Sequence, residues 1–466
     1  MTEPGAPLIV TAPFDGAEIA SLPTDGPEAI EDALSTAERL FRDRKAWLPP
    51  WRRIEILERA AALMGERVEA LALQAAREGG KPLVDSRVEA ERAVEGFKAA
   101  LDGLRTEAGE VVPMNLNRAS AGRIAFTVKE PIGPVVAVSA FNHPINLIVH
   151  QVVPAVAAGC PVIVKPAEDT PLSCGAVAEI LVEAGLPPEW CRMVLPADLG
   201  LAEALVTDPR VGFFSFIGSA RVGWYLRSKL APGTRCALEH GGAAPVIVAA
   251  DADLDAVVPS LLKGGYYHAG QVCVSVQRVF AARAIARELA EALAAGAAAL
   301  RVGDPTEART EVGPLIRPGE AARVGDWVAE AGAAPVLTGG QRISDSLYAP
   351  TLLYDPPDDV RVSREEVFGP VVCVYPFDEL ETAVARANAL PFAFQAAVFT
   401  RDLETALAGF EALRASAIMV NDHTAFRVDW MPFAGLGQSG LGVGGIPHTL
   451  RDMQIDKMLV LRSAGG

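Results

Sequence analysis

Two short stretches decide how this sequence is interpreted: Leu238-Glu239-His240-Gly241-Gly242 and Gly270-Gln271-Val272-Cys273. The first places a carboxylate at the end of a β-type run, and the second places a thiol after a Gly-Gln pair. A thiol and a carboxylate together supply a nucleophile and a base, which covalent catalysis requires. The alternative is a strand-end Glu239 in a surface ion pair and a Cys273 that serves as a small buried hydrophobe. The rest of the chain decides between the two.

Length and charge exclude several classes of protein. With 466 residues the chain is long enough for more than one domain, and 50% hydrophobic with 21% charged residues is ordinary for a globular protein. The 58 acidic and 42 basic residues give a net charge of −16, which disfavours nucleic acids and anionic membrane surfaces as partners. No apolar run approaches a membrane span, and Met1–Pro4 shows no signal peptide, so we expect a cytoplasmic protein.

The six cysteines are scattered without CxxC pairs or a histidine cluster, which argues against a disulfide framework and against a metal site. Cys273 stands apart, because Gly-Gln precedes it and the polar Ser275 and Gln277 follow it. The others stand in apolar surroundings and are interpreted as core residues; they are Cys160, Cys174, Cys191, Cys236 and Cys373.

The hydrophobic pattern predicts an α/β protein. Residues 27–107 have helical spacing with breaks near Pro49-Pro50 and Gly79–Pro82, which predicts three helices. From 133 to 240, apolar strand-like runs alternate with helical stretches and predict a doubly wound parallel sheet. A second α/β pattern occupies residues 241–445. Ligands of such sheets bind beyond the carboxyl ends of the strands, so the site is expected there.

Further motifs occur in the order of a known family. They are Phe141-Asn142-His143-Pro144, Lys165-Pro166-Ala167-Glu168, Phe216-Ile217-Gly218-Ser219, Glu366-Val367-Phe368-Gly369-Pro370, and Pro432-Phe433 before Ser439-Gly440. Together with the two stretches above, they resemble the aldehyde dehydrogenase superfamily over essentially the whole chain. The resemblance implies an NAD(P)-dependent oxidoreductase that converts an aldehyde to a carboxylic acid.

The resemblance also implies a domain scheme. A Rossmann-type dinucleotide-binding domain would occupy 1–116 and 131–240, and a catalytic α/β domain would occupy 241–446. A small β oligomerisation segment would comprise 117–130 and 447–466. Such segments project from the body and pair with another subunit, because a lone hairpin is marginal in water. We therefore expect a homodimer or a homotetramer.

The resemblance assigns catalysis to three residues. Cys273 adds to the aldehyde carbon and gives a thiohemiacetal. Asn142, with the backbone N–H of Cys273, stabilises the oxyanion; the alternative for Asn142 is an Asx turn before Pro144. Glu239 activates the water that hydrolyses the thioester. Family members that pass the acyl group to coenzyme A generally lack this glutamate, so its presence favours a free acid as product.

Candidate cofactor residues come from the same motifs. Lys165 and Glu168 are placed at the adenosine ribose, where a carboxylate repels the 2′-phosphate of NADP, so NAD is favoured. Gly218 and Ser219 form a strand-to-helix turn that suits a pyrophosphate. Glu366 is placed at the nicotinamide-side ribose. The remaining candidates beside the cofactor are Val222, Phe368 and Phe141. The alternatives are a solvated Lys–Glu pair, a helix cap and an ordinary turn.

The substrate is indicated less clearly. The stretch Asn421–Asp429 resembles the branch that holds lactaldehyde and phosphonoacetaldehyde dehydrogenases. Within it, Arg427 is a candidate to bind a carboxylate, sulfonate or phosphonate. Val272 argues against a phosphorylated substrate, because phosphate-handling relatives tend to place Arg there. We expect a small, polar or anionic aldehyde. Further polar candidates, for which a structural role is the alternative, are Arg92, His143 and His150.

Some features leave other interpretations open. The family commonly has a Lys where this chain has Gly437, and a Glu where it has Val443-Gly444-Gly445, so a proton relay through that Glu cannot be transferred. His240 stands in place of the commoner Leu. Other classes also remain: a thiol esterase or hydrolase that uses Cys273 without a cofactor, a coenzyme A-acylating dehydrogenase, and a catalytically silent member of the fold.

Overall fold

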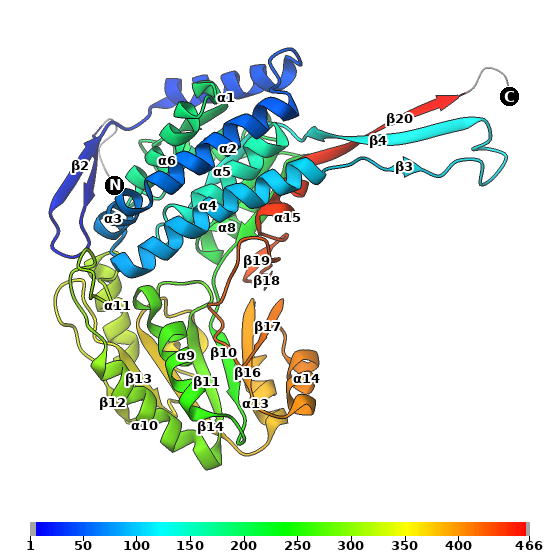
Figure 1. The fold of residues 1–466 in the computed structure, drawn as a ribbon. Coiled ribbons are helices and arrows are strands. Elements are labelled where there is room, and N and C mark those ends of the chain that lie inside the picture. The colour runs from blue at the N-terminus through cyan, green and yellow to red at the C-terminus, as the bar shows by residue number, and fades with distance from the viewer. Residues whose placement is uncertain (1–5, 463–466) are drawn as a thin grey trace.

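The computed structural model describes residues 6–462 and shows two α/β bodies with a thin sheet that projects from one of them (Figure 1). Residues 1–5 and 463–466 lie outside the described residues, so they leave the two ends of the predicted domain scheme without structural description. Among residues 6–462, no helix combines the length and the apolar character needed to cross a lipid bilayer.

The first body is built on a six-stranded sheet with the order β19-β9-β8-β5-β6-β7. Its core strands are parallel, and β19 pairs antiparallel with β9. These strands form because short runs of valine, isoleucine and phenylalanine are buried on both faces of the sheet. Their bounds are Val135–Val138 (β5), Val162–Lys165 (β6), Cys191–Met193 (β7), Phe213–Ile217 (β8), Arg235–Glu239 (β9) and Gly440–Leu441 (β19).

Helices cover both faces of this sheet (Figure 1). They are α1 (Pro27–Arg42), α2 (Pro50–Glu66), α3 (Val68–Gly79), α4 (Leu83–Thr106), α5 (Asn146–Ala158), α6 (Pro171–Glu183), α7 (Leu199–Thr207), α8 (Ala220–Arg227) and α15 (Ile446–Asp452). Every residue of α5 is buried, since it packs between the sheet and the helices α2 and α4. A hairpin of β1 (Leu8–Thr11) and β2 (Glu18–Leu22) precedes α1.

The prediction of three helices in residues 27–107 is wrong, because the structure has four. The extra break lies at Arg67, where φ is −111° and ψ is 10°. Gly65 stands two residues before this break, but a single glycine inside a helical pattern is a weak signal.

The second body is a seven-stranded sheet with the order β12-β13-β14-β11-β10-β16-β17, parallel except for β12. The strands are β10 (Ala244–Val248), β11 (Val276–Ala282), β12 (Val336–Thr338), β13 (Thr351–Tyr354), β14 (Val371–Phe377), β16 (Gln395–Phe399) and β17 (Ala417–Val420). The helices are α9 (Leu254–Tyr266), α10 (Arg283–Ala299), α11 (Pro318–Ala329), α12 (Arg361–Arg364), α13 (Leu380–Ala387) and α14 (Leu403–Ala412).

The projecting sheet joins β3 (Val111–Val112), β4 (Arg123–Pro131) and β20 (Gln454–Arg462) in antiparallel pairs. The strand expected from alternation at Arg118–Lys129 therefore begins later. Three elements depart from the predicted domain ranges: β3 belongs to this sheet, β19 belongs to the sheet of the first body, and α15 packs on α4 and α5 of the first body. A short pair, β15 (Phe392–Ala393) and β18 (Leu436–Gly437), leads the chain back to the first body.

Candidate active site

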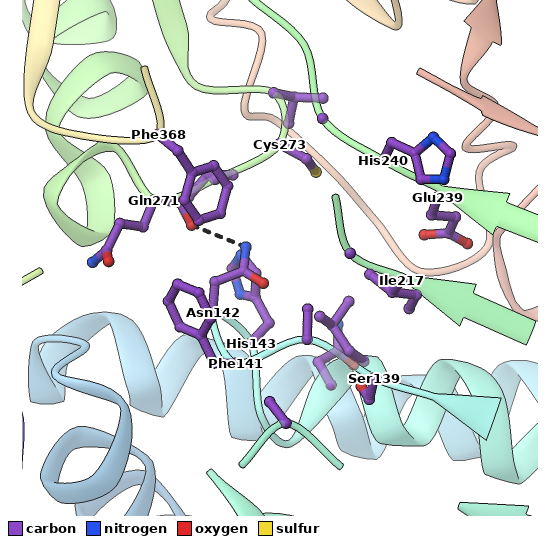
Figure 2. Close-up of a pocket in the computed structure, with 18 of the residues that line it drawn as sticks. Ser139, Phe141, Asn142, His143, Ile217, Glu239, His240, Gln271, Cys273 and Phe368 are labelled. Atoms are coloured by element: carbon purple, nitrogen blue, oxygen red, sulfur yellow. Dashed lines mark hydrogen bonds between the residues drawn. The ribbon is translucent and has the colours of Figure 1, made fainter. Parts of the chain in front are cut away.

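A cavity of about 660 Å³ lies where the two bodies meet. The carboxyl ends of β5, β8 and β9 open into it from the first body, as expected for ligand sites of parallel sheets. The second body contributes the turn before β11 and the loop before β14. Figure 2 shows Asn142, Glu239 and the sulfur of Cys273 around the same space. The cavity therefore brings together the predicted nucleophile, base and oxyanion donor.

A tight turn presents Cys273 to this cavity. After α9 ends at Tyr266, the backbone passes through left-handed conformations at His268 (φ 49°), Ala269 (φ 54°) and Gly270 (φ 70°). A side chain on Gly270 would overlap the carbonyl group of Gly369, so only glycine fits there. Helix α9 thus stops at Tyr266, and the turn redirects the chain toward the site.

The Cys273 thiol is neutral in this environment. Burial raises its pKa to about 12, and the charges of Glu366 and Glu239 add to the effect, while Arg427 opposes it. The side chain is partly buried, in contrast to Cys160, which lies in the core. A neutral thiol is a poor nucleophile, so attack requires removal of the proton by a base.

Asn142 is held beside the nucleophile turn. Its side-chain amide donates a hydrogen bond of 2.9 Å to the carbonyl of Gln271, drawn as the dashed line in Figure 2. The Gln271 side chain in turn donates to Pro314 O (3.2 Å) and accepts from Ile316 N (3.0 Å). An amide has two N–H groups, so one remains for a developing oxyanion.

A buried ion pair fixes the loop that carries Asn142. Lys81 Nζ lies 2.8 Å from Glu89 Oε2, and both side chains are fully buried. The other oxygen of Glu89 accepts from Ile145 N (2.8 Å) and Asn146 N (2.9 Å), at the start of α5. A carboxylate at a helix N-terminus satisfies free N–H groups and favours the dipole. The ion pair and these hydrogen bonds therefore fix the loop that carries Asn142.

Glu239 ends β9 and reaches the cavity from the side opposite Asn142. Burial raises the pKa of its carboxyl group, and Arg427 opposes this shift. A methyl group built on Gly444 would overlap the Glu239 carboxylate. The missing side chain at position 444 therefore makes room for the predicted base.

The residues around Glu366 fit a nicotinamide-side ribose. Glu366 Oε1 accepts from Gly242 N at 3.2 Å, and burial raises its pKa to about 8. A side chain on Gly241 would overlap this carboxylate, which is the close approach that the glycine allows. Phe368, with φ of 46°, meets Phe141 edge to face at 5.9 Å. Both aromatic rings line the cavity.

Gln277 holds this loop in place. Its side chain donates to Glu365 O (2.7 Å) and accepts from Val367 N (2.9 Å), on either side of Glu366. The cofactor candidate is thus tied to β11, which follows the nucleophile directly.

The predicted adenosine-side residues lie at different depths. Gly218, Ser219 and Val222 line the cavity at the start of α8. Lys165 and Glu168 do not line it; they form a pair at 3.6 Å, and the Glu168 side chain is 52% exposed. The Lys165 side chain is 15% exposed, so only Glu168 of this pair is largely in solvent.

Arg427 is the cation that faces the reacting groups. Its guanidinium lies 3.5 Å from the centre of the Phe433 ring, and it contacts His150 Nδ1 at 3.3 Å. Among residues 6–462, no carboxylate lies within ion-pair distance of it. Burial lowers the pKa of Arg427, while Glu239 raises it. An unpaired guanidinium in a cavity is suited to bind an anion.

Two other predicted substrate residues, Arg92 and His150, contact Asp429. Arg92 lines the cavity but forms a bidentate pair with Asp429, at 2.8 and 3.2 Å. His150 does not line the cavity, because its Nε2 contacts Asp429 Oδ1 at 2.8 Å and the side chain is buried. Asn146 donates to the same oxygen at 2.9 Å. In the structure His150 lies behind the cavity wall and contacts Asp429 and Arg427.

A family comparison agrees with this geometry. The model of the aldehyde dehydrogenase family matches residues 2–459. The chain belongs to the aldehyde dehydrogenase family. It is 37% identical over 436 residues to 3-sulfolactaldehyde dehydrogenase of Priestia megaterium, covering 93% of this chain and 91% of that protein.

Solved aldehyde dehydrogenase structures share the fold over the full chain. One is aldehyde dehydrogenase 21 from Physcomitrella patens in complex with succinate, with a TM-score of 0.94, 34% identity, and coverage of 100% and 97%. Another is glyceraldehyde-3-phosphate dehydrogenase of Methanocaldococcus jannaschii with NADP, with a TM-score of 0.93, 33% identity, and coverage of 99% and 100%. The predicted α/β aldehyde dehydrogenase fold is confirmed, and the protein is an NAD(P)-dependent oxidoreductase.

The sequence assigned no role to several residues of this aldehyde dehydrogenase site. They are Lys81, Glu89, Gln271, Gln277, Asp429 and Phe433. One signal was present: Asp85, Glu89 and Arg92 are spaced by four and three residues, which places charged groups on one face of α4. That face lies toward the cavity, since Asp85 and Arg92 line it.

Proposed function

We propose that this aldehyde dehydrogenase uses NAD to oxidise a small anionic aldehyde to its carboxylate. The observation that carries the proposal is the unpaired guanidinium of Arg427 in the cavity that also holds Cys273, Asn142 and Glu239. Two similarities support it: a curated relative acts on 3-sulfolactaldehyde, and a solved relative binds succinate. Both compounds carry a strong anion at the end of a short chain.

In the proposed mechanism, Cys273 is the nucleophile. Because burial raises the pKa of its thiol to about 12, a carboxylate must accept the proton, and Glu239 lies across the cavity. Raised pKa values make Glu239 a stronger base than an exposed glutamate. The thiolate adds to the aldehyde carbon, and Asn142 with the Cys273 N–H stabilises the oxyanion.

The second half of the reaction needs a water molecule. A bound nicotinamide would supply the hydride acceptor, and the acyl group would then be held on Cys273 as a thioester. Glu239 releases the thiol proton to solvent and so becomes a base again. It then removes a proton from water, which attacks the thioester and releases the acid, with the Cys273 thiolate as leaving group. Asn142 stabilises the same oxygen in this step.

The cofactor proposal rests on residues that fit a dinucleotide. Glu366 would hold the nicotinamide-side ribose, and Phe368 with Phe141 would flank the ring. Gly218, Ser219 and Val222 would hold the pyrophosphate at the start of α8. Lys165 and Glu168 would hold the adenosine ribose. The negative charge of Glu168 supports NAD over NADP, because it would repel a 2′-phosphate.

Arg427 would bind the anion of the substrate, and Phe433 would keep the guanidinium in position by stacking. Arg92 would contribute less, since Asp429 already neutralises it. His143 would provide a further polar contact.

The decisive experiment compares matched aldehydes with both cofactors. Succinic semialdehyde and butanal share a four-carbon chain but differ in the terminal carboxylate. We expect a kcat/KM at least about tenfold higher for succinic semialdehyde, lost in Arg427→Met and partly retained in Arg427→Lys. An equal preference in wild type and Arg427→Met would refute the anion site.

The assembly is also a proposal. We propose that the chain functions as a homodimer or homotetramer in a reducing compartment such as the cytoplasm, with the first body as the cofactor domain, the second as the catalytic domain and the projecting sheet as the oligomerisation segment. The projecting sheet exposes apolar side chains, among them Ile124 (65%), Val128 (45%), Met458 (54%) and Leu461 (50%). A partner subunit would cover them. Light scattering on the purified protein tests this, and a monomer would contradict it.

A further inference from the structure

The protonation of His143 is set by its neighbour. Lys81 Nζ lies 2.6 Å from His143 Nδ1 and 2.8 Å from Glu89 Oε2, in a fully buried position. Burial disfavours the ammonium, but the charges and hydrogen bonds of Glu89 and Tyr267 together outweigh it and raise the pKa of Lys81. An ammonium group has hydrogen-bond donors and no acceptor. Lys81 therefore donates to both neighbours, and Nδ1 of His143 must accept.

A neutral imidazole that accepts at Nδ1 carries its proton at Nε2. His143 is neutral, because burial and the charge of Lys81 hold its pKa well below the usual value. Within residues 6–462, its Nε2 makes no hydrogen bond, and it is not among the buried atoms that lack a partner. The side chain is 12% exposed and lines the cavity. His143 therefore presents an N–H donor to the substrate space.

The surroundings hold this donor in one orientation. The imidazole stacks on the Tyr267 ring at 5.9 Å and meets the His268 ring edge to face at 6.4 Å. Figure 2 shows His143 next to Asn142, which precedes it in the chain. Arg92 and Arg427 line the same cavity as His143.

We propose that Nε2–H of His143 donates a hydrogen bond to a hydroxyl group on the carbon next to the aldehyde. The inference rests on the proposed function for the direction in which the substrate lies. With the carbonyl oxygen at Asn142 and the anion at Arg427, the carbon between them faces the residue after Asn142. The site is then selective for 2-hydroxyaldehydes, a class that includes the sulfolactaldehyde used by the curated relative.

Lactaldehyde and propanal test this directly, because they differ only in the 2-hydroxyl and neither is charged. The measured quantity is the ratio of kcat/KM for lactaldehyde to kcat/KM for propanal. With a hydrogen bond of ordinary strength, this ratio should be about tenfold higher in wild type than in His143→Phe. His143→Phe keeps an aromatic ring on Tyr267 and removes the donor. His143→Gln can accept from Lys81 and still donate, so it should restore much of the ratio.

A second variant covers the case in which His143→Phe does not fold. Lys81→Met with Glu89→Gln removes both charges at similar volume and releases His143 to place its proton on either nitrogen. The lactaldehyde-to-propanal ratio should fall about threefold, since two tautomers then compete. An unchanged ratio in either folded variant would overturn the proposal.

The result is separable from the anion site. His143→Phe should leave the succinic semialdehyde-to-butanal ratio intact, because neither compound has a 2-hydroxyl. Arg427→Met should alter that ratio and leave the lactaldehyde-to-propanal ratio intact. If wild type prefers lactaldehyde over propanal but does not prefer succinic semialdehyde over butanal, the proposed anionic substrate is wrong and the role of His143 stands.

Discussion

The side-chain amide of Asn142 donates to the main-chain carbonyl of Gln271 at 2.9 Å, and this bond joins the two bodies beside the nucleophile. Asn142 follows β5 of the first sheet, whereas Gln271 precedes Cys273 in the turn before β11. The same Gln271 carries a side chain that ties the backbone at Pro314 and Ile316. Gln271 therefore links the oxyanion donor Asn142, the nucleophile Cys273 and the backbone at Pro314 and Ile316.

Asn142→Asp should lower kcat by about 10²- to 10³-fold, because a carboxylate repels both the Gln271 carbonyl and a developing oxyanion. NAD binding, followed by calorimetry, should be unaffected. The matched control is Asn388→Asp, since Asn388 also donates its amide to a carbonyl, Ala412 O at 2.9 Å, but on the exposed surface. If Asn142→Asp and Asn388→Asp had equal kcat, the oxyanion role would be ruled out.

The thiol of Cys273 should react with iodoacetamide faster as the pH rises. Its pKa is raised to about 12 by burial, so the thiolate fraction increases about tenfold per pH unit below that value. The alkylation rate of the free enzyme should show no plateau below pH 10. Arg427→Met should slow alkylation at each pH, because Arg427 opposes the shift. A plateau near neutral pH would contradict a protonated resting thiol.

Removing one member of the Lys81–Glu89 pair should be costly. Lys81→Met leaves a buried carboxylate without its partner and should lower the free energy of unfolding by about 3–5 kcal/mol. The double variant with Glu89→Gln should recover most of this loss, while kcat stays reduced because Asn142 is held less firmly. Denaturant unfolding and kcat measure the two effects.

Glu78→Gln is the matched control for the substitutions at Lys81 and Glu89. Glu78 is a buried carboxylate that accepts from Leu172 N and Ser173 N at the start of α6, as Glu89 does at the start of α5. It should lower stability without lowering kcat at saturating NAD. A loss of kcat as large as that of the double variant would assign the effect to general loosening.

The parallel strands of the first sheet were predictable because their residues are buried on both faces. Val162–Val164 shows this directly, since every residue is apolar. Strand β11 does not show this pattern, because Gln277 and Arg278 interrupt its apolar residues. Both are buried, and their polar groups are satisfied by backbone carbonyls such as Ala243 O and Glu365 O. Such compensation depends on tertiary contacts that a linear pattern does not contain.

The site residues also fall into those that the sequence could predict and those that it could not. Cys273, Glu239 and Asn142 lie in short motifs with glycine or proline, and these motifs point to backbone turns at strand ends. Asp429 stands in the stretch Asn421–Asp429, but its partner Arg92 lies on α4, so the motif alone does not show the pair. The structure is needed to see that Asp429 pairs with Arg92 and that, among residues 6–462, Arg427 has no carboxylate partner.

Gly444→Ala should slow both the formation and the hydrolysis of the acyl-enzyme, because Glu239 is the proposed base for the thiol and for water. The added methyl group would meet the Glu239 carboxylate and the carbonyl oxygen of Phe433, so the carboxylate must move. Rapid mixing should show no burst of NADH and a steady-state rate reduced about tenfold or more. Glu239→Gln should give the same kinetics. Gly319→Ala, whose added methyl group meets no atom within 4 Å, should behave as wild type. A steady-state rate in Gly444→Ala equal to that of wild type would show that the carboxylate is not needed where the structure places it.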